Sequence, residues 1–175
     1  MGYFAISQDN SLNNIVKFKI PSPNPLQRRI EITKEDVAGV EGVFRFDVRS
    51  DPDNIYPDIL DEPTFLVSNR VSKVFQYYFE SEDFRPAMLM DVSNKQHRLY
   101  WLPLLKQIEC LHETTVFNKD KTTQKMVLRK EQVNKQKIFR VDGTMDKTVV
   151  IHLDIAESLL RRGCMGISLT PVQCL

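Results

Sequence analysis

The densest group of reactive side chains is the run Cys110–Glu113, which reads CLHE. On a strand, Cys110 and His112 share one face, because side chains alternate between the two faces. A thiolate beside an imidazole is a nucleophile or half of a metal site. Both uses need further partners from distant segments of the chain. The simpler expectation is a half-buried cysteine with an exposed histidine.

Ser68 is the second candidate, because it stands where a short apolar run meets a segment with helical spacing. A nucleophilic serine on a strand-to-helix turn needs small neighbours, usually glycines. The residues two positions away are Leu66 and Arg70, and the nearest glycines are Gly42 and Gly143. A serine at a helix start instead accepts a backbone N–H bond, which is worth about 1 kcal/mol. We therefore predict that Ser68 caps a helix.

Other motifs that carry chemistry are missing from the sequence. The three histidines, His97, His112 and His152, have no second histidine three or four residues away, so no helical zinc pair exists. The sequence has no GxGxxG, P-loop or HExxH motif, and the run DGTMD lacks the calcium-loop pattern. We expect no catalytic residue, no metal ion and no cofactor.

The composition is that of an ordinary folded domain: among 175 residues, 42% are hydrophobic and 27% are charged. Three cysteines are an odd number without repeated spacing, so no disulfide framework is expected. The N-terminus lacks the basic start and apolar core of a signal peptide, and no apolar run approaches the roughly 18 residues that span a bilayer. We expect a cytoplasmic protein without a membrane partner.

The net charge of +1 conceals two regions of opposite sign. The segment from Glu31 to Glu62 contains ten acidic residues and three basic ones. The segment from Lys119 to Lys137 contains seven basic residues and two acidic ones. Such regions are solvated surface, or they steer a charged partner. The basic stretch contains no aromatic side chain, and nucleic-acid binding is therefore not expected.

The first fifty residues alternate between apolar and polar side chains. Three stretches, residues 15–20, 28–33 and 43–49, show this period of two, which is typical of an antiparallel sheet with one wet face. The proline-rich and acidic loop at residues 50–63 follows and is the best candidate for a boundary.

Two strand–helix–strand units come after this loop. The first has a strand at residues 64–67, a helix from Ser68 to Phe79 and a strand at 85–92. The second begins at Thr148, has a helix with Asp154 and Glu157 as a capping pair, and ends in the strand MGISLTPV.

The two units align without gaps when Thr64 is placed on Thr148, which puts Phe75 on Leu159. An internal duplication explains this alignment, but any capped helix after a strand gives the same pattern, and we favour that simpler explanation.

The predicted class is α+β, with an N-terminal, mainly antiparallel β-sheet followed by two strand–helix–strand units packed on a mixed sheet. We expect residues 1–175 to form a single domain. A division into a β-rich lobe over residues 1–55 and an α+β region over residues 56–175 stays open.

The order of segments from Tyr56 to Val172 resembles the bacterial immunity proteins of polymorphic toxin systems, a family first catalogued as a domain of unknown function. The motifs that carry the resemblance are LVSNRV at the first helix, IFR before the last unit, and GCMGISLTPV at the end. His152 departs from the pattern, because the family often has a serine there. The resemblance implies a non-enzymatic cytoplasmic inhibitor that binds a cognate toxin protein domain, and it brings no catalytic residue with it.

Aromatic and acidic side chains are the expected anchors for such a partner. Exposed tyrosine and tryptophan mark protein interfaces, and acidic groups suit a basic toxin surface. The candidates are Tyr77, Tyr100, Trp101, Asp51, Asp53, Asp58, Asp61 and Glu62. Two other functions stay open: a small-ligand or peptide-binding module with an aromatic groove, and a hydrolase that uses Cys110, His112 and Glu113. A homo-oligomer is not excluded.

Overall fold

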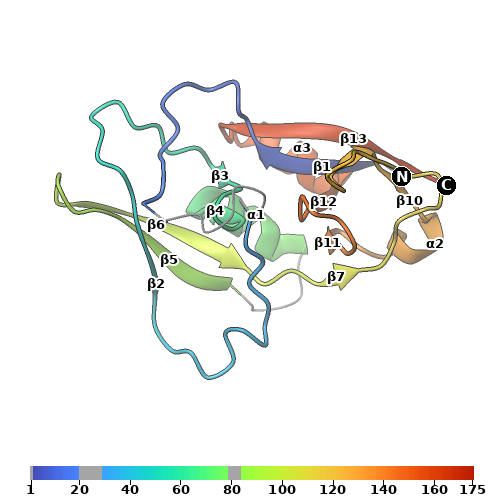
Figure 1. Ribbon diagram of the computed structural model, residues 1–175, viewed down its shortest axis with the longest axis horizontal. Helices are drawn as coiled ribbons and strands as arrows, with labels where there is room; N and C mark the ends of the chain where they lie inside the picture. The colour runs from blue at the N-terminus through green and yellow to red at the C-terminus, as the bar shows by residue number, and fades with distance from the viewer. Residues whose placement is uncertain (1, 20–28, 79–83) are drawn as a thin grey trace.

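The computed structural model describes residues 2–19, 29–78 and 84–175, and its α+β class confirms the prediction (Figure 1). This part of the chain forms two main sheets, three helices and a small ribbon of β8 (Val116–Phe117) and β9 (Thr123–Lys125). None of the described helices is long and apolar enough to cross a membrane.

One sheet, here called the central sheet, has the strand order β2–β5–β6–β4–β3. Its strands are β2 (Phe44–Asp47), β3 (Ile59–Leu60), β4 (Leu66–Ser68), β5 (Phe84–Asp91) and β6 (Gln96–Pro103). β6 is antiparallel to both of its neighbours, β5 and β4, while β2 is parallel to β5 at the edge.

The other sheet, here called the terminal sheet, has the order β10–β13–β1–β12–β11–β7. Its strands are β1 (Tyr3–Gln8), β7 (Gln107–Ile108), β10 (Val127–Leu128), β11 (Ile138–Val141), β12 (Val149–His152) and β13 (Ile167–Cys174). The N-terminal strand β1 lies between β12 and β13 and is antiparallel to both. Consequently the N-terminus and the C-terminus lie side by side (Figure 1).

Both predicted strand–helix–strand units are present. Helix α1 (Asn69–Tyr78) connects β4 to β5, and α3 (Leu153–Arg161) connects β12 to β13, while the short α2 (Lys130–Val133) follows β10. The two long helices contact each other. Their apolar faces, with Phe75 and Leu159 fully buried, join side chains from both sheets in the largest core cluster.

The two units also share their strand pairing, which the sequence alone does not reveal. In each unit an antiparallel strand is inserted between the two strands that the helix connects: β6 in the central sheet and β1 in the terminal sheet. In each, a further antiparallel strand (β3 or β11) lies outside the first of these strands, and a parallel strand (β2 or β10) lies outside the second.

This agreement over five strand positions favours an internal duplication. A capped helix after a strand does not by itself dictate the neighbours of that strand, so the simpler explanation that we favoured accounts for less than the duplication does. The copies differ in connectivity: β6 continues from β5 through a hairpin, whereas β1 comes from the opposite end of the chain. The terminal unit is thus a circularly permuted version of the central one.

The predicted N-terminal sheet is wrong in detail. Residues 15–18 form only isolated bridges, residues 29–33 form no strand, and β2 pairs in parallel with β5. Ile20 and residue 28 lie outside the described residues. Side chains such as Val16 and Ile32 cover the outer face of the central sheet. The backbone of residues 17–19 forms only a short antiparallel bridge with residues 47–49, in which Lys19 N–H donates to Asp47 and Arg49 N–H donates to Lys17, both at 2.8 Å.

A partly buried ion network joins the two units. Glu31 lies 3.4 Å from the guanidinium of Arg140 in β11 and 3.3 Å from the ammonium of Lys147. Asp61, which follows β3, pairs at 3.0 Å with Arg29, and burial raises the pKa of its carboxyl group. Arg29 also donates a hydrogen bond of 2.9 Å to the carbonyl of Asp146, beside Lys147. The network therefore connects β3 with the region of β11, which occupies the equivalent place in the terminal unit.

Candidate functional site

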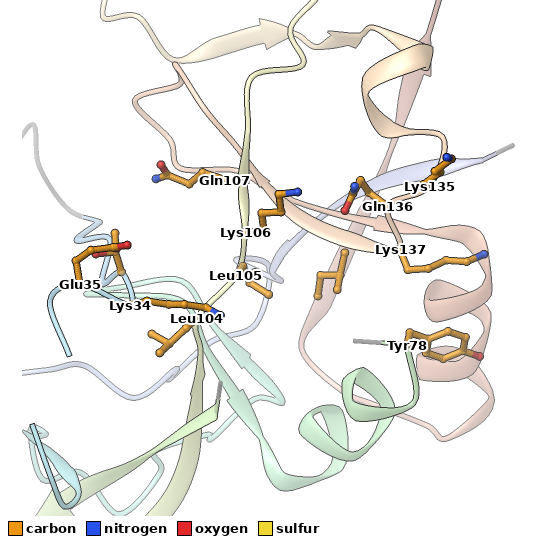
Figure 2. Close-up of a pocket in the computed structure, with 12 residues that line it drawn as sticks. Lys34, Glu35, Tyr78, Leu104, Leu105, Lys106, Gln107, Lys135, Gln136 and Lys137 are labelled. Atoms are coloured by element: carbon orange, nitrogen blue, oxygen red, sulfur yellow. The ribbon is translucent and has the colours of Figure 1, made fainter. Parts of the chain in front are cut away.

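A groove of about 670 Å³ opens on the surface of the described part of the chain. It lies where the linker between β6 and β7 meets the end of α1 and the start of β11. Figure 2 shows Lys34 and Glu35 on one side of this linker and residues 135–137 on the other. The described lining residues are Thr33, Lys34, Glu35, Tyr78, Leu104, Leu105, Lys106, Gln107, Lys135, Gln136, Lys137 and Ile138.

The backbone of the groove walls is held by the terminal sheet. The carbonyl of Lys106 accepts a hydrogen bond of 2.9 Å from the N–H of Arg140, and the carbonyl of Lys137 accepts one of 2.8 Å from the N–H of His152. The N–H of Gln136 donates to Val133 at the end of α2, at 2.9 Å. These bonds fix the backbone of the segments that carry three of the four lysines.

Positive charge dominates the groove. Glu35 is the only acid among the described lining residues, against four lysines. The ammonium of Lys137 lies 2.6 Å from the carboxylate of Asp154, and this bond lowers the pKa of Asp154. Lys106 and Lys135 are exposed and form no ion pair with any described residue. The groove therefore has an excess of positive charge that suits an anionic ligand.

The floor of the groove is apolar. Leu104 and Ile138 are buried, and the partly buried Leu105 and Tyr78 pack against the main core. The hydroxyl of Tyr78 is hydrogen-bonded to the hydroxyl of Ser158 at 2.8 Å. An apolar floor beneath a cationic rim suits a ligand that has both apolar and acidic groups.

Of the predicted aromatic anchors, only Tyr77 is well exposed, at 77%. Tyr100 was expected at the surface, but it is buried, its hydroxyl donates a bond of 2.6 Å to the carbonyl of Pro57, and burial raises its pKa. Trp101 is only partly exposed and packs against the core. The reason is that β6, which carries both residues, is a central strand whose two faces are covered in this region.

The predicted acidic set also divides. Asp51, Asp53 and Glu62 are exposed. Asp58 instead accepts hydrogen bonds from the hydroxyl of Ser68 and from the backbone N–H of Met165, and Asp61 is buried in its ion pair with Arg29. A carboxylate that is mostly shielded from solvent and already has its partners is a structural group, so the partly buried Asp58 and the buried Asp61 leave the set of surface anchors.

Ser68 caps α1 as predicted. Its hydroxyl oxygen accepts a bond of 3.3 Å from the N–H of Val71. The cap of α3 differs from the prediction: the imidazole of His152, rather than Asp154, accepts the N–H bond, at 3.3 Å. Glu157, the other half of the predicted capping pair, lies 3.3 Å from Arg161 in an i,i+4 ion pair.

The CLHE run does not assemble a reactive pair. Cys110 is completely buried, and burial raises the pKa of its thiol to about 12. The Nδ1 atom of His112 lies 2.9 Å from the hydroxyl of Thr114. Over residues 2–19, 29–78 and 84–175, no three His, Cys, Asp or Glu side chains converge as metal ligands.

The groove itself was not predicted. The one sequence signal that falls in the groove is the excess of positive charge in the stretch that contains Lys135 and Lys137. The other walls come from residues 33–35, Tyr78 and residues 104–107, which the tertiary fold brings together.

Comparison with known proteins adds no relative: no family model matches the chain, and no curated protein matches it. The chemistry of the groove and of the exposed surface therefore carries the functional argument.

Proposed function

We propose that this chain is a non-enzymatic immunity protein that binds and neutralises a cognate bacterial toxin domain in the cytoplasm. The resemblance of residues 56–172 supplies the class, and the groove is the observation that carries the proposal. The groove has positively charged lysines above an apolar floor. Ser68 caps a helix, Cys110 is buried in the core, and Asp58 is hydrogen-bonded to Ser68. A surface of this kind holds a partner through charge and packing.

Co-expression tests the proposal. The partner to use is the C-terminal toxin domain of a large secreted protein encoded directly upstream of this chain. Cells that express the toxin domain should stop growing, and this chain should restore growth and co-purify with the domain as a complex. The absence of such a gene, or a toxin domain that neither binds the chain nor is neutralised by it, would reject the proposal.

The exposed aromatic anchor gives a second, finer test. Replacement of Tyr77 by alanine should weaken the complex by about thirtyfold if Tyr77 is a central contact. Val92→Ala is the matched control, because Val92 is also strongly exposed, at 62%, and lies in the turn between β5 and β6. If both variants lost the same affinity, or if neither lost any, Tyr77 would not be a contact of the interface.

The remaining exposed acids are tested by charge reversal. The variant Asp51→Lys, Asp53→Lys, Glu62→Lys should associate with the toxin domain about tenfold more slowly at low salt, because it loses electrostatic steering. The control reverses three exposed acids elsewhere: Glu41, Glu109 and Glu113. Association rates that stay the same in the first variant would exclude an acidic docking surface.

A small-ligand or peptide-binding module is the second candidate, and the size of the groove favours it. Its volume of about 670 Å³ lies within the range of about 300–1,000 Å³ that is usual for ligand pockets. A thermal-shift screen of anionic small molecules separates this candidate, because a true ligand should raise the melting temperature in proportion to the logarithm of its concentration.

The hydrolase candidate depends on an accessible Cys110. Iodoacetamide should alkylate Cys110 in the native protein at least about a hundredfold more slowly than in urea, because the thiol is buried and protonated. Rapid alkylation of the native protein would restore this candidate.

A further inference from the structure

We infer that the groove receives an extended, acidic segment of the partner protein, one in which acidic side chains alternate with apolar ones. This inference rests on the proposed function and specifies how the partner is recognised. It adds a second charge relationship to the one that the sequence suggested, because the groove is basic, while Asp58 and Asp61 have structural roles and leave Asp51, Asp53 and Glu62 as the exposed acids of the set.

The distribution of the lysines indicates an extended ligand. Lys106 and Lys135 come from two separate segments of the rim, the linker between β6 and β7 and the segment after α2. Lysine is a compact point charge that accepts a carboxylate in many orientations, whereas tight phosphate sites usually add arginine forks or converging backbone N–H groups. The described lining residues include no arginine. Dispersed ammonium groups therefore fit several carboxylates along a chain better than one compact anion.

The neutral lining residues fit the same ligand. Gln136 makes its hydrogen bonds among the described residues through its backbone, so its side-chain amide is free to bond to a peptide backbone. Leu105 and Tyr78 offer partly exposed apolar surface between the cations. Apolar side chains of the segment would contact this floor while acidic ones turn toward the rim.

Nucleic acid fits less well. Proteins that bind single strands present rows of aromatic rings for base stacking. Tyr78 is the only aromatic residue among the described lining residues, and its hydroxyl is bonded to Ser158.

The probe for the test is a fluorescein-labelled peptide of alternating glutamate and leucine, about ten residues long, which spans roughly 33 Å when extended. Fluorescence anisotropy at about 20 mM salt should detect binding, and affinity should fall at about 200 mM salt because exposed charges are then screened. The variant Lys106→Gln, Lys135→Gln should bind about tenfold more weakly, because it loses both unpaired cations.

The control variant is Lys73→Gln, Lys125→Gln, which removes the same charge at exposed sites outside the groove. It should bind the peptide as the wild type does. Absence of peptide binding, or an equal loss in the two variants, would overturn the inference. Tighter binding of tripolyphosphate or of a short oligothymidylate, lost in the groove variant, would overturn it too, since the groove would then be a phosphate site.

The two proposals fail in different ways. If the chain neutralises the toxin domain but the groove variant does so with unchanged affinity, only the acidic-segment inference fails. If the peptide binds in the groove but no toxin domain is recognised, only the immunity function fails.

Discussion

The central and terminal units show how one arrangement of strands and one helix is built from two different connections. In the central unit the inserted strand β6 follows β5 directly, through a hairpin that pairs Asp91 with Gln96. In the terminal unit the inserted strand β1 precedes the whole unit in the chain, yet Tyr3 pairs with Val172 in the same antiparallel sense. The comparison teaches that strand pairing and burial define these units more strongly than chain connectivity does.

The helices show a second difference. Both begin directly after a strand and both have a side chain that accepts a backbone N–H bond, but the acceptor is a hydroxyl in Ser68 and an imidazole in His152. The imidazole also packs edge-on against the ring of Tyr3, with 5.3 Å between ring centres. The cap of the terminal unit thus contributes packing that a serine cannot.

The largest expected effect comes from the paired core positions. Phe75→Ala should lower the free energy of unfolding by about 4 kcal/mol and Leu159→Ala by about 3 kcal/mol, because each leaves a cavity in the core that both helices share. Urea unfolding gives both values. Tyr77→Ala on the exposed face of α1 is the control and should change stability by about 0.5 kcal/mol or less. A cost below about 1 kcal/mol at either core position would break the equivalence of the two helices.

The ion network between the units comes next. Glu31→Gln should lower the free energy of unfolding by about 3 kcal/mol, because Arg140 then keeps its charge in a buried place without its carboxylate partner. The neighbouring Glu35→Gln, which changes an exposed side chain, should cost about 0.5 kcal/mol or less. Chemical denaturation of both variants would show whether the network supports the junction.

A circular permutant tests the duplication directly. In this permutant a turn of about four residues joins the termini, and the chain is opened between Asn10 and Ser11. β13 is then connected directly to β1, as β5 is connected to β6. The permutant should fold cooperatively and lose about 2 kcal/mol or less, because the new ends lie in an exposed turn. Opening the chain between Ala5 and Ile6 interrupts β1 and should abolish the cooperative unfolding transition measured by circular dichroism. If the permutant opened between Asn10 and Ser11 also failed to fold, the result would contradict the comparison.

The smallest expected effect lies in the caps. Ser68→Ala and His152→Ala should each lower the free energy of unfolding by about 1 kcal/mol. The variant His152→Asn separates the two contributions of the imidazole, since asparagine caps a helix well but lacks the ring that packs on Tyr3. Equal stability of His152→Ala and His152→Asn in thermal unfolding would show that His152 acts through packing alone.

Local signals predicted the parts of the fold that depend on nearby residues. The strand–helix–strand units and the cap at Ser68 follow from apolar spacing and from a polar residue at a helix start, which act within a few positions. Of the three predicted N-terminal strands, residues 43–49 contain β2, while the described parts of residues 15–20 and 28–33 form no named strand. These two predictions are wrong because a segment that covers a sheet face alternates in the same way as a strand inside a sheet.

The site depends on tertiary contacts, and these set the limit of prediction. Nothing in the run LYWLPLL indicates which segments cover it, so Tyr100 and Trp101 were expected at the surface. Asp58 and Asp61 were expected to face a partner because their hydrogen-bond donors, such as Met165 and Arg29, are distant in the sequence. The groove combines segments that are separated along the chain, and no local pattern marks them.

The place of β1 has a consequence for synthesis of the protein. β1 leaves the ribosome before every other described element, yet its two neighbours, β12 and β13, are the last strands to emerge. Until they appear, its edges are unpaired and open to wrong contacts. The strands of the central sheet are not separated in this way. We therefore expect the central sheet to fold first during synthesis, and β1, the first strand to be made, to pair among the last.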